Sequence, residues 1–232
     1  MSSLVKVRNL TKYYGAFPAL KGISFDVEQG KIVGLLGPNG CGKTTTIKIL
    51  AGIINQYTGE AEIGGHKPGV ESKKIISYLP EKTYLSDWMK ARDAVDFFND
   101  FYSDFDRNKA MEMLERFQLT PNMQIKAMSK GMQEKMQLVL VMSRNAALYL
   151  LDEPLGGVDP ATRGGILDII LNNYTENSSL LLSTHLIYDV ERIFDSVIMM
   201  GFGEIFLADT VDNIRHNTGK SVDEYFREVF RC

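Results

Sequence analysis

The sequence is poor in cysteine and contains no long apolar run. Its two cysteines, Cys41 and Cys232, form no Cys-x-x-Cys pair, so we expect neither a disulfide framework nor a cysteine metal site. The longest unbroken apolar stretch is residues 146–151, whereas a membrane-spanning helix needs about 20 residues. The amino-terminal residues lack the apolar core of a secretory signal. These absences predict a chain that works in the reducing cytoplasm and does not cross a membrane by itself.

Concentrated positive charge is also absent. The 26 Lys and Arg residues are scattered among 29 Asp and Glu residues, and the formal net charge is −3. A dedicated nucleic-acid binder usually gathers its basic residues into a patch, so no nucleic-acid partner is expected. The three histidines are too dispersed to form a metal cluster. With 232 residues, of which 44% are hydrophobic, the chain is long enough for one large domain or for a core with an inserted subdomain.

Short β-rich runs alternate with turns and helical segments in the first and last thirds of the chain. The spacing of apolar residues predicts helices over 47–54 and 161–174, and we expect a polar loop over 66–74. Residues 197–200 and 205–208 flank a Gly-Phe-Gly turn and predict a hairpin. This alternation predicts the α/β class, with a mostly parallel sheet covered on both faces. The other expected strands are 5–7, 23–27, 31–36, 60–63, 75–79, 148–151 and 180–182.

The pattern changes near residue 86 and stays helical to about residue 145. Pro121 separates two helical stretches within this segment. An aromatic stripe over residues 97–105 lies on one helical face, and we interpret it as the interior of the segment rather than as a ligand site. We therefore expect one domain over residues 1–232, in which 1–85 and 146–232 form the core and 86–145 form an inserted helical subdomain.

A glycine-rich motif, Gly37–Thr44, follows the strand expected at 31–36 and fits G-x-x-x-x-G-K-[ST] at every fixed position. In such a loop, backbone N–H groups curl around a triphosphate and a helix N-terminus adds partial positive charge. We expect Lys43 to pair with the β- and γ-phosphates and Thr44 to supply an oxygen to Mg²⁺. The predicted nucleotide-binding residues of this phosphate loop are Gly37, Pro38, Asn39, Gly40, Cys41, Gly42, Lys43, Thr44 and the adjoining Thr45.

A second motif is the apolar run 148–151 followed by two carboxylates. Asp152 is placed to hold Mg²⁺, and Glu153 is placed to orient and deprotonate the attacking water. Acids at the end of a strand can simply be solvated. Their presence in one chain with a phosphate loop favours the catalytic interpretation.

Together the motifs resemble those of ABC ATPases. The phosphate loop, Asp152–Pro154, Gly157–Pro160 and Ser183–His185 occur in the family's order, and the likeness runs from about residue 4 to residue 208. The resemblance implies a RecA-like P-loop NTPase core, a small antiparallel β subdomain and an inserted α-helical subdomain. It also implies an ATPase subunit that uses ATP and Mg²⁺ and works with a separate integral-membrane permease, on the inner face of the cell membrane.

The resemblance further implies roles for residues outside these two motifs. Residues 129–132 occupy the place of the family's signature loop, which closes on the ATP of a second ATPase subunit in a head-to-tail dimer. Ser129 and Gly131 would then reach that γ-phosphate. His185 corresponds to the histidine that contacts the γ-phosphate and helps hold the water, and Asp159 belongs to the loop that joins the two sites across the dimer.

Three positions leave alternatives open. Tyr14 sits where the family stacks an aromatic ring on adenine, although the neighbouring Tyr13 could serve and a lone aromatic residue is often a packing residue. Glu81 stands where the family commonly has Gln, and it either ligates Mg²⁺ or is a solvated loop acid. The signature loop has Lys130 where the commonest form has Gly, which puts side-chain details of the contact in doubt but not the identity of the loop.

Segment 82–92 borders, in the family, the groove that receives a short helix of the membrane subunit. Exposed aromatic side chains would suit that docking, and internal packing of Trp88 is the alternative.

Transport is the leading hypothesis, and Glu81 with the signature loop resembles bacterial exporters, so we expect export. A soluble ABC-type ATPase in nucleic-acid maintenance or translation usually carries a long coiled-coil insertion or two cassettes, which this chain lacks. A regulator without turnover is disfavoured because Glu153 and His185 fill both catalytic positions.

Overall fold

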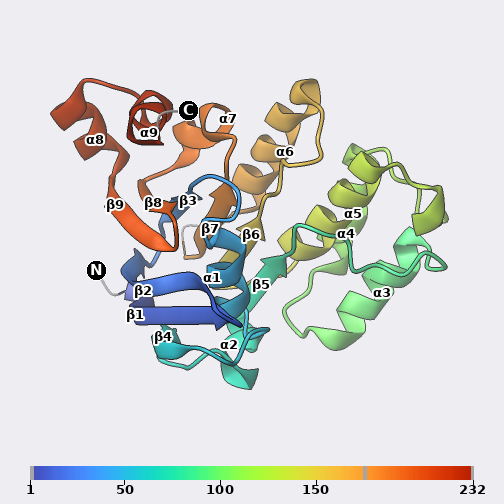
Figure 1. Ribbon diagram of the computed structural model, residues 1–232. Coiled ribbons are helices and arrows are strands. Elements are labelled where there is room, and N and C mark those ends of the chain that lie inside the picture. The colour runs from blue at the N-terminus through green and yellow to red at the C-terminus, as the bar shows by residue number, and fades with distance from the viewer. Residues whose placement is uncertain (1–2, 175–176, 231–232) are drawn as a thin grey trace.

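Two β-sheets and a separate group of helices form the molecule (Figure 1). The computed structural model describes residues 3–174 and 177–230, so Cys232 lies outside the described part. The antiparallel sheet has the strand order β2-β1-β4 and the larger sheet β5-β6-β7-β3-β8-β9. The strands of the antiparallel sheet are β1 (Ser3–Tyr14), β2 (Phe17–Glu28) and β4 (Thr58–Ile63). Those of the larger sheet are β5 (Ile76–Leu79), β6 (Leu148–Asp152), β7 (Ser179–Thr184), β3 (Ile32–Leu36), β8 (Ser196–Gly201) and β9 (Glu204–Thr210).

The larger sheet is parallel except for β9, which pairs antiparallel with β8. The prediction of a mostly parallel sheet is therefore confirmed, and so is the hairpin at its end. Strands β3, β6 and β7 are buried along their whole length, as is typical of strands that have both faces covered. In a parallel sheet the carboxyl ends of the strands meet at one edge. The segments that follow β3, β5, β6 and β7 are thereby brought together.

Two groups of helices lie at opposite sides of the molecule. Figure 1 shows α3, α4 and α5 together on the β5 side of the larger sheet, whereas α8 and α9 lie near β9. No helix in the described ranges is long and apolar enough to cross a membrane. The helices are α1 (Lys43–Leu50), α2 (Val70–Ile75), α3 (Ala91–Phe101), α4 (Arg107–Arg116), α5 (Lys130–Met142), α6 (Pro160–Asn173), α7 (Ile187–Val190), α8 (Val211–Thr218) and α9 (Val222–Phe230), with 3₁₀ turns at Ile125–Ala127 and Glu191–Ile193.

Several boundaries differ from the sequence-based prediction. The strands expected at 5–7 and 23–27 extend over Ser3–Tyr14 and Phe17–Glu28, and two helical segments also differ. The helix expected over 47–54 ends at Leu50, because the backbone leaves the helical region at Gly52, where φ is +66°. The expected polar loop 66–74 contains α2. Ser72 explains this helix: its hydroxyl is buried and accepts a hydrogen bond of 2.9 Å from the backbone N–H of Gly69, which caps the helix start.

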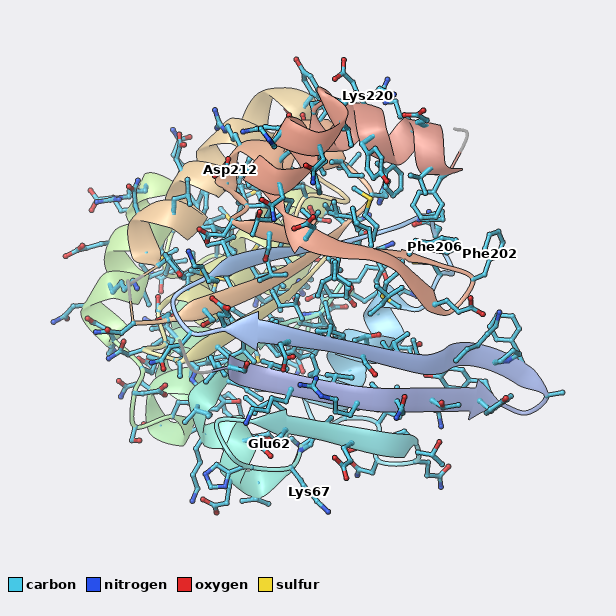
Figure 2. All side chains as sticks on the ribbon, turned by 90° about the vertical axis from the view of Figure 1, so that its left-hand side faces the viewer. Glu62, Lys67, Phe202, Phe206, Asp212 and Lys220 are labelled. Carbon is cyan, nitrogen blue, oxygen red and sulfur yellow. The ribbon has the colours of Figure 1, made fainter. Side chains whose placement is uncertain are left out.

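The turn of the β8–β9 hairpin is hydrogen-bonded to the phosphate loop. The N–H of Gly203, in the hairpin turn, donates to the carbonyl oxygen of Cys41, and the carbonyl of Gly203 accepts from the N–H of Lys21. Figure 2 shows Phe202 and Phe206 at the end of this hairpin, pointing away from the sheet, and both rings are exposed. The turn therefore joins β2 to the loop between β3 and α1.

Candidate functional site

A cavity of about 760 Å³ lies at the carboxyl edge of the larger sheet. Its walls come from the β1–β2 hairpin, the phosphate loop, the loops that follow β5 and β6, and one face of α5. Its volume falls in the range of small-molecule sites. The sequence-predicted site residues that line it are Tyr14, Asn39, Gly40, Gly42, Lys43, Thr44, Thr45, Glu81, Asp152, Glu153 and His185.

The phosphate loop packs tightly between β3 and α1. A Cβ atom at Gly37 would lie 2.3 Å from the carbonyl oxygen of Met200, and Gly42 has φ of +111°, so these two glycines are required for this backbone path. The Lys43 ammonium folds back over the loop and donates to the carbonyl oxygens of Gly37 at 2.7 Å and Pro38 at 3.3 Å. The carbonyl oxygens of the phosphate loop thus hold the Lys43 ammonium at the wall of the cavity.

A buried carboxylate marks the corner beside the start of α1. The hydroxyls of Thr44 and Ser183 donate to Oδ1 of Asp152 at 3.1 and 2.6 Å. Oδ2 of Asp152 is buried and has no hydrogen-bond partner. Burial raises the pKa of Asp152, and the hydrogen bonds from Ser183 and Thr44 oppose that rise. A buried carboxylate oxygen without a partner is costly, and a bound cation would compensate it.

This corner suits Mg²⁺ bound together with a triphosphate. In the described ranges no group of three His, Cys, Asp or Glu side chains could hold a metal ion. The corner offers the Thr44 hydroxyl and the Asp152 carboxylate, with Glu81 in the same cavity. Mg²⁺ prefers one or two carboxylates together with phosphate oxygens and waters, so a sparse set of protein ligands fits this ion. We call Thr44, Asp152 and Glu81 the metal corner.

Glu153 directly follows the strand that carries Asp152, and its backbone is unusual. Its φ is +52°, a value uncommon for a residue with a side chain, and its N–H donates to the carbonyl oxygen of Ser183 at 3.1 Å. Its Oε2 lies 3.0 Å from Nδ1 of His185, and its Oε1 lies 3.5 Å from Nζ of Lys43. The carboxylate is therefore held between a histidine and the phosphate-loop lysine.

The β1–β2 hairpin brings two aromatic rings to the opposite wall. Tyr14 and Phe17 pair across the hairpin tip, and both line the cavity. Tyr13 is exposed and does not line it. The ammonium of Lys12 lies 5.0 Å from the centre of the Tyr14 ring. Of the two tyrosine candidates, the structure brings Tyr14 to the site. Sequence reasoning missed Phe17, although the tight Gly-Ala turn between the two aromatics signals their pairing.

The signature loop lies at the exposed start of α5. Ser129 caps this helix, its hydroxyl accepting from the N–H of Met132 at 3.3 Å, and a Cβ at Gly131 would meet nothing within 4 Å. Neither residue lines the cavity of its own chain, and neither does the exposed Asp159. Lys130 is 79% exposed, and its Nζ lies 3.9 Å from Oε1 of Glu134. The loop is accessible to a second molecule.

Three residues that sequence reasoning missed have buried polar atoms without partners: Tyr78, Glu134 and Gln137. Glu134 and Gln137 line the cavity, and Gln137 is only 2% exposed. With Lys130 they follow the i, i+4, i+7 spacing of one helix face. That spacing was available in the sequence, but Gln137 stands in an otherwise apolar run, and only the packing of α5 shows that it faces the cavity.

A second cavity, of about 580 Å³, lies between α1, β5, α3 and α5, and we call it the groove. Its lining includes Phe97 and Phe101, which are 54% and 71% exposed, so the interpretation of the aromatic stripe as interior is wrong for these two rings. Phe98 and Phe105 are buried as expected. Internal packing of Trp88 is also wrong, since this side chain is 72% exposed. The exposed side of α3 therefore faces a concave surface.

Comparisons with known proteins agree with the fold. Residues 20–156 match the family model described as ABC transporter. An uncharacterized ABC transporter ATP-binding protein of Methanocaldococcus jannaschii is 36% identical over 219 residues, which are 92% of this chain and 80% of that protein.

Solved structures of similar fold are also ATP-binding cassettes of ABC transporters. The structure of an ATP binding subunit of an ABC transporter superposes with a TM-score of 0.88 at 28% identity, over 98% of this chain and 100% of the other. A dimeric cassette in a post-hydrolysis state with ADP and phosphate has a TM-score of 0.79 at 23% identity, over 89% of this chain and 98% of the other, and this likeness concerns the fold alone. The chain therefore belongs to the ABC transporter family and is an ATP-binding subunit, an ATPase, with the α/β fold of that family's cassettes.

Proposed function

We propose that the chain dimerises head to tail around two molecules of Mg²⁺·ATP and uses their hydrolysis to drive a separate membrane permease in export. The observation that carries the proposal is the set of buried polar atoms without partners at one cavity. Oδ2 of Asp152 and Oε1 of Gln137 both belong to residues that line it, and Oε1 of Glu153, which also has no hydrogen-bond partner, forms an ion pair with Lys43 at 3.5 Å. Buried polar groups are nearly always paired, so these atoms indicate a polar ligand with a cation.

The residues of the site divide the work of hydrolysis. Bound Mg²⁺ supplies charge neutralisation at the β- and γ-phosphates. Thr44 and Asp152 would hold this ion, and Lys43 would transfer its hydrogen bonds from the loop carbonyls to phosphate oxygens. Glu153 accepts the proton of the attacking water. His185 holds the Glu153 carboxylate at 3.0 Å, and its exposed edge is available to the γ-phosphate.

Tyr14 gives the nucleobase a ring to stack on, and the second subunit completes the site. The exposed signature loop, with the Ser129 hydroxyl and the Gly131 N–H at a helix start, suits a γ-phosphate on the opposing chain. Asp159 would connect the two sites. We further propose that residues 86–145 move as one helical subdomain against a core of residues 1–85 and 146–232, because the signature loop must be presented to the partner.

Docking of the permease is assigned to the groove. Aromatic side chains exposed in a concave surface suit the apolar face of a short helix, and Tyr84, Phe97 and Phe101 offer such a surface. This contact would keep the protein at the inner face of the membrane. Export is supported by Glu81 and the signature loop, whose residues resemble those of bacterial exporters.

The first test concerns dimer closure and Lys130. In a Glu153→Gln background, Mg²⁺·ATP is expected to double the molar mass measured by light scattering. At low salt, Lys130→Glu should weaken this dimerisation more than Lys130→Gln, because a cation near the opposing γ-phosphate contributes about 1 kcal/mol when largely exposed. The difference should shrink as salt rises. Failure of ATP to form a dimer contradicts the proposed function, whereas equal dimerisation of the parent and both variants contradicts only the role of Lys130.

The second test concerns the groove. Phe101→Asp is expected to release the protein from the membrane fraction of its source cells while ATP turnover stays within about twofold of the parent, because Phe101 lies outside the nucleotide cavity. Phe202→Asp is the matched control, since Phe202 is similarly exposed but lies outside the groove. Membrane association that survives Phe101→Asp, or that is lost equally in both variants, would contradict docking at the groove.

A further inference from the structure

Tyr78 is a residue of β5 that lines the groove but not the nucleotide cavity. Its ring is part of the groove wall and packs against the apolar cluster that includes α1. Its hydroxyl is buried and has no hydrogen-bond partner. A buried hydroxyl without a partner is costly, so the position of this oxygen calls for an explanation.

Strand register directs Tyr78 toward the metal corner. Tyr78 pairs with Leu150 in the parallel β5–β6 ladder, and Asp152 stands two residues further along β6, so the side chains of Tyr78, Leu150 and Asp152 emerge on the same face of the sheet. Helix α1 covers that face: Thr44 in its first turn bonds Asp152, and Lys48, one turn later, lines the groove with Tyr78. Tyr78 therefore lies between the groove and Asp152.

The chemistry of the surroundings makes this hydroxyl a donor. Burial and the negative charges of Asp152 and Glu81 raise the pKa of Tyr78, so the hydroxyl keeps its proton at neutral pH. A protonated phenol beside two carboxylates can give a hydrogen bond to either of them. The two hydrogen bonds that Asp152 receives both reach Oδ1, and its Oδ2, which has no hydrogen-bond partner, is assigned to the metal. Glu81 is exposed, and the loop that carries it begins two residues after Tyr78.

We propose that Tyr78 is a positioning residue for the metal corner, whose hydroxyl donates a hydrogen bond to the Glu81 carboxylate when Mg²⁺·ATP draws that side chain inward. The inference rests on the proposed function, because it supposes Mg²⁺·ATP in the cavity. Since the ring of Tyr78 is fixed in the groove wall, one rigid side chain connects the surface assigned to the permease with the corner assigned to the metal. Displacement of the groove wall would then move the Tyr78 hydroxyl and change the position of the Glu81 carboxylate.

Tyr78→Phe tests the proposal, because it removes only the hydroxyl. In the free protein no hydrogen bond is lost, so the melting temperature should stay the same or rise. The Mg²⁺ concentration for half-maximal binding of a fluorescent ATP analogue should rise about three- to tenfold, while binding in EDTA should not change. Tyr149→Phe, on the neighbouring strand β6, is the matched control. Its hydroxyl donates to the carbonyl oxygen of Arg144 at 2.6 Å, so this variant should melt earlier and keep the Mg²⁺ midpoint of the parent.

A double-mutant cycle identifies the partner of the hydroxyl. If Tyr78 acts through Glu81, then Tyr78→Phe should add no further shift of the Mg²⁺ midpoint in a Glu81→Ala background. Additive shifts, or an unchanged midpoint in Tyr78→Phe alone, would overturn the inference and leave the proposed function standing. A parent protein that binds the analogue equally well with and without Mg²⁺ would overturn both.

Discussion

Replacing Glu153 by Gln is expected to slow ATP hydrolysis by about a hundredfold or more and to leave ATP binding intact. Glutamine keeps the shape of the side chain, but its amide cannot accept the proton of the attacking water, and a general base contributes about 10²- to 10⁴-fold. The carboxylate lies where that role requires, with Oε2 3.0 Å from His185 and Oε1 3.5 Å from Lys43. Phosphate release and equilibrium binding of labelled ATP measure the two effects separately.

Glu134→Gln is the matched control for this prediction. Glu134 is a second carboxylate in the same cavity, and it also has a buried oxygen without a partner. It lies against Gly157 and near Lys130, however, and in the described ranges it forms no ion pair with His185 or Lys43. Its amide variant should keep turnover within about threefold of the parent. If Glu153→Gln hydrolyses ATP within a factor of about two of the parent, Glu153 is not the general base.

The sequence predicts those parts of the fold and of the site that depend on short contiguous segments. The phosphate loop, and the apolar run ending in Asp152 and Glu153, each combine a strand with the chemistry at its carboxyl end. In a parallel sheet such segments must meet at one edge. The structure confirms that Lys43, Thr44, Asp152, Glu153 and His185 lie around one cavity. Their catalytic roles remain predictions for the experiments above.

What the sequence did not predict depends on contacts between distant segments. Side chains along a strand alternate between the two faces of the sheet, and the sequence of β5 does not determine which face carries Tyr78. Only the β5–β6 register shows that Tyr78 shares a face with Asp152. Gln137 stands in an apolar helix, and its role as a cavity wall follows from how α5 packs on β5. Phe97 and Phe101 follow an apolar helical period, yet they are exposed because the groove leaves that side of α3 uncovered.

The end of α5 is anchored to the core by one buried arginine. Arg144 is only 3% exposed, and its guanidinium makes two hydrogen bonds to Asp104, at 2.9 and 3.0 Å. It also donates to the backbone carbonyls of Lys74, in the last turn of α2, and Ile76, the first residue of β5. The guanidinium stacks on Tyr102 at 3.9 Å from the ring centre. One side chain thus joins the helical segment to the strand that leads to Glu81.

Arg144→Ala is therefore expected to lower the free energy of unfolding by about 3 kcal/mol or more, because it leaves a partly buried carboxylate and two carbonyls without their donor. Arg107→Ala is the matched control. Arg107 bonds Asp96 at the same distance of 2.9 Å, but about half of each of these two side chains is exposed, so the loss should be at most about 1 kcal/mol. Arg144→Lys should fall between them, since an ammonium gives neither the paired hydrogen bonds nor the stacking. Urea unfolding followed by circular dichroism measures all three, and equal losses at Arg144 and Arg107 would contradict the anchoring role.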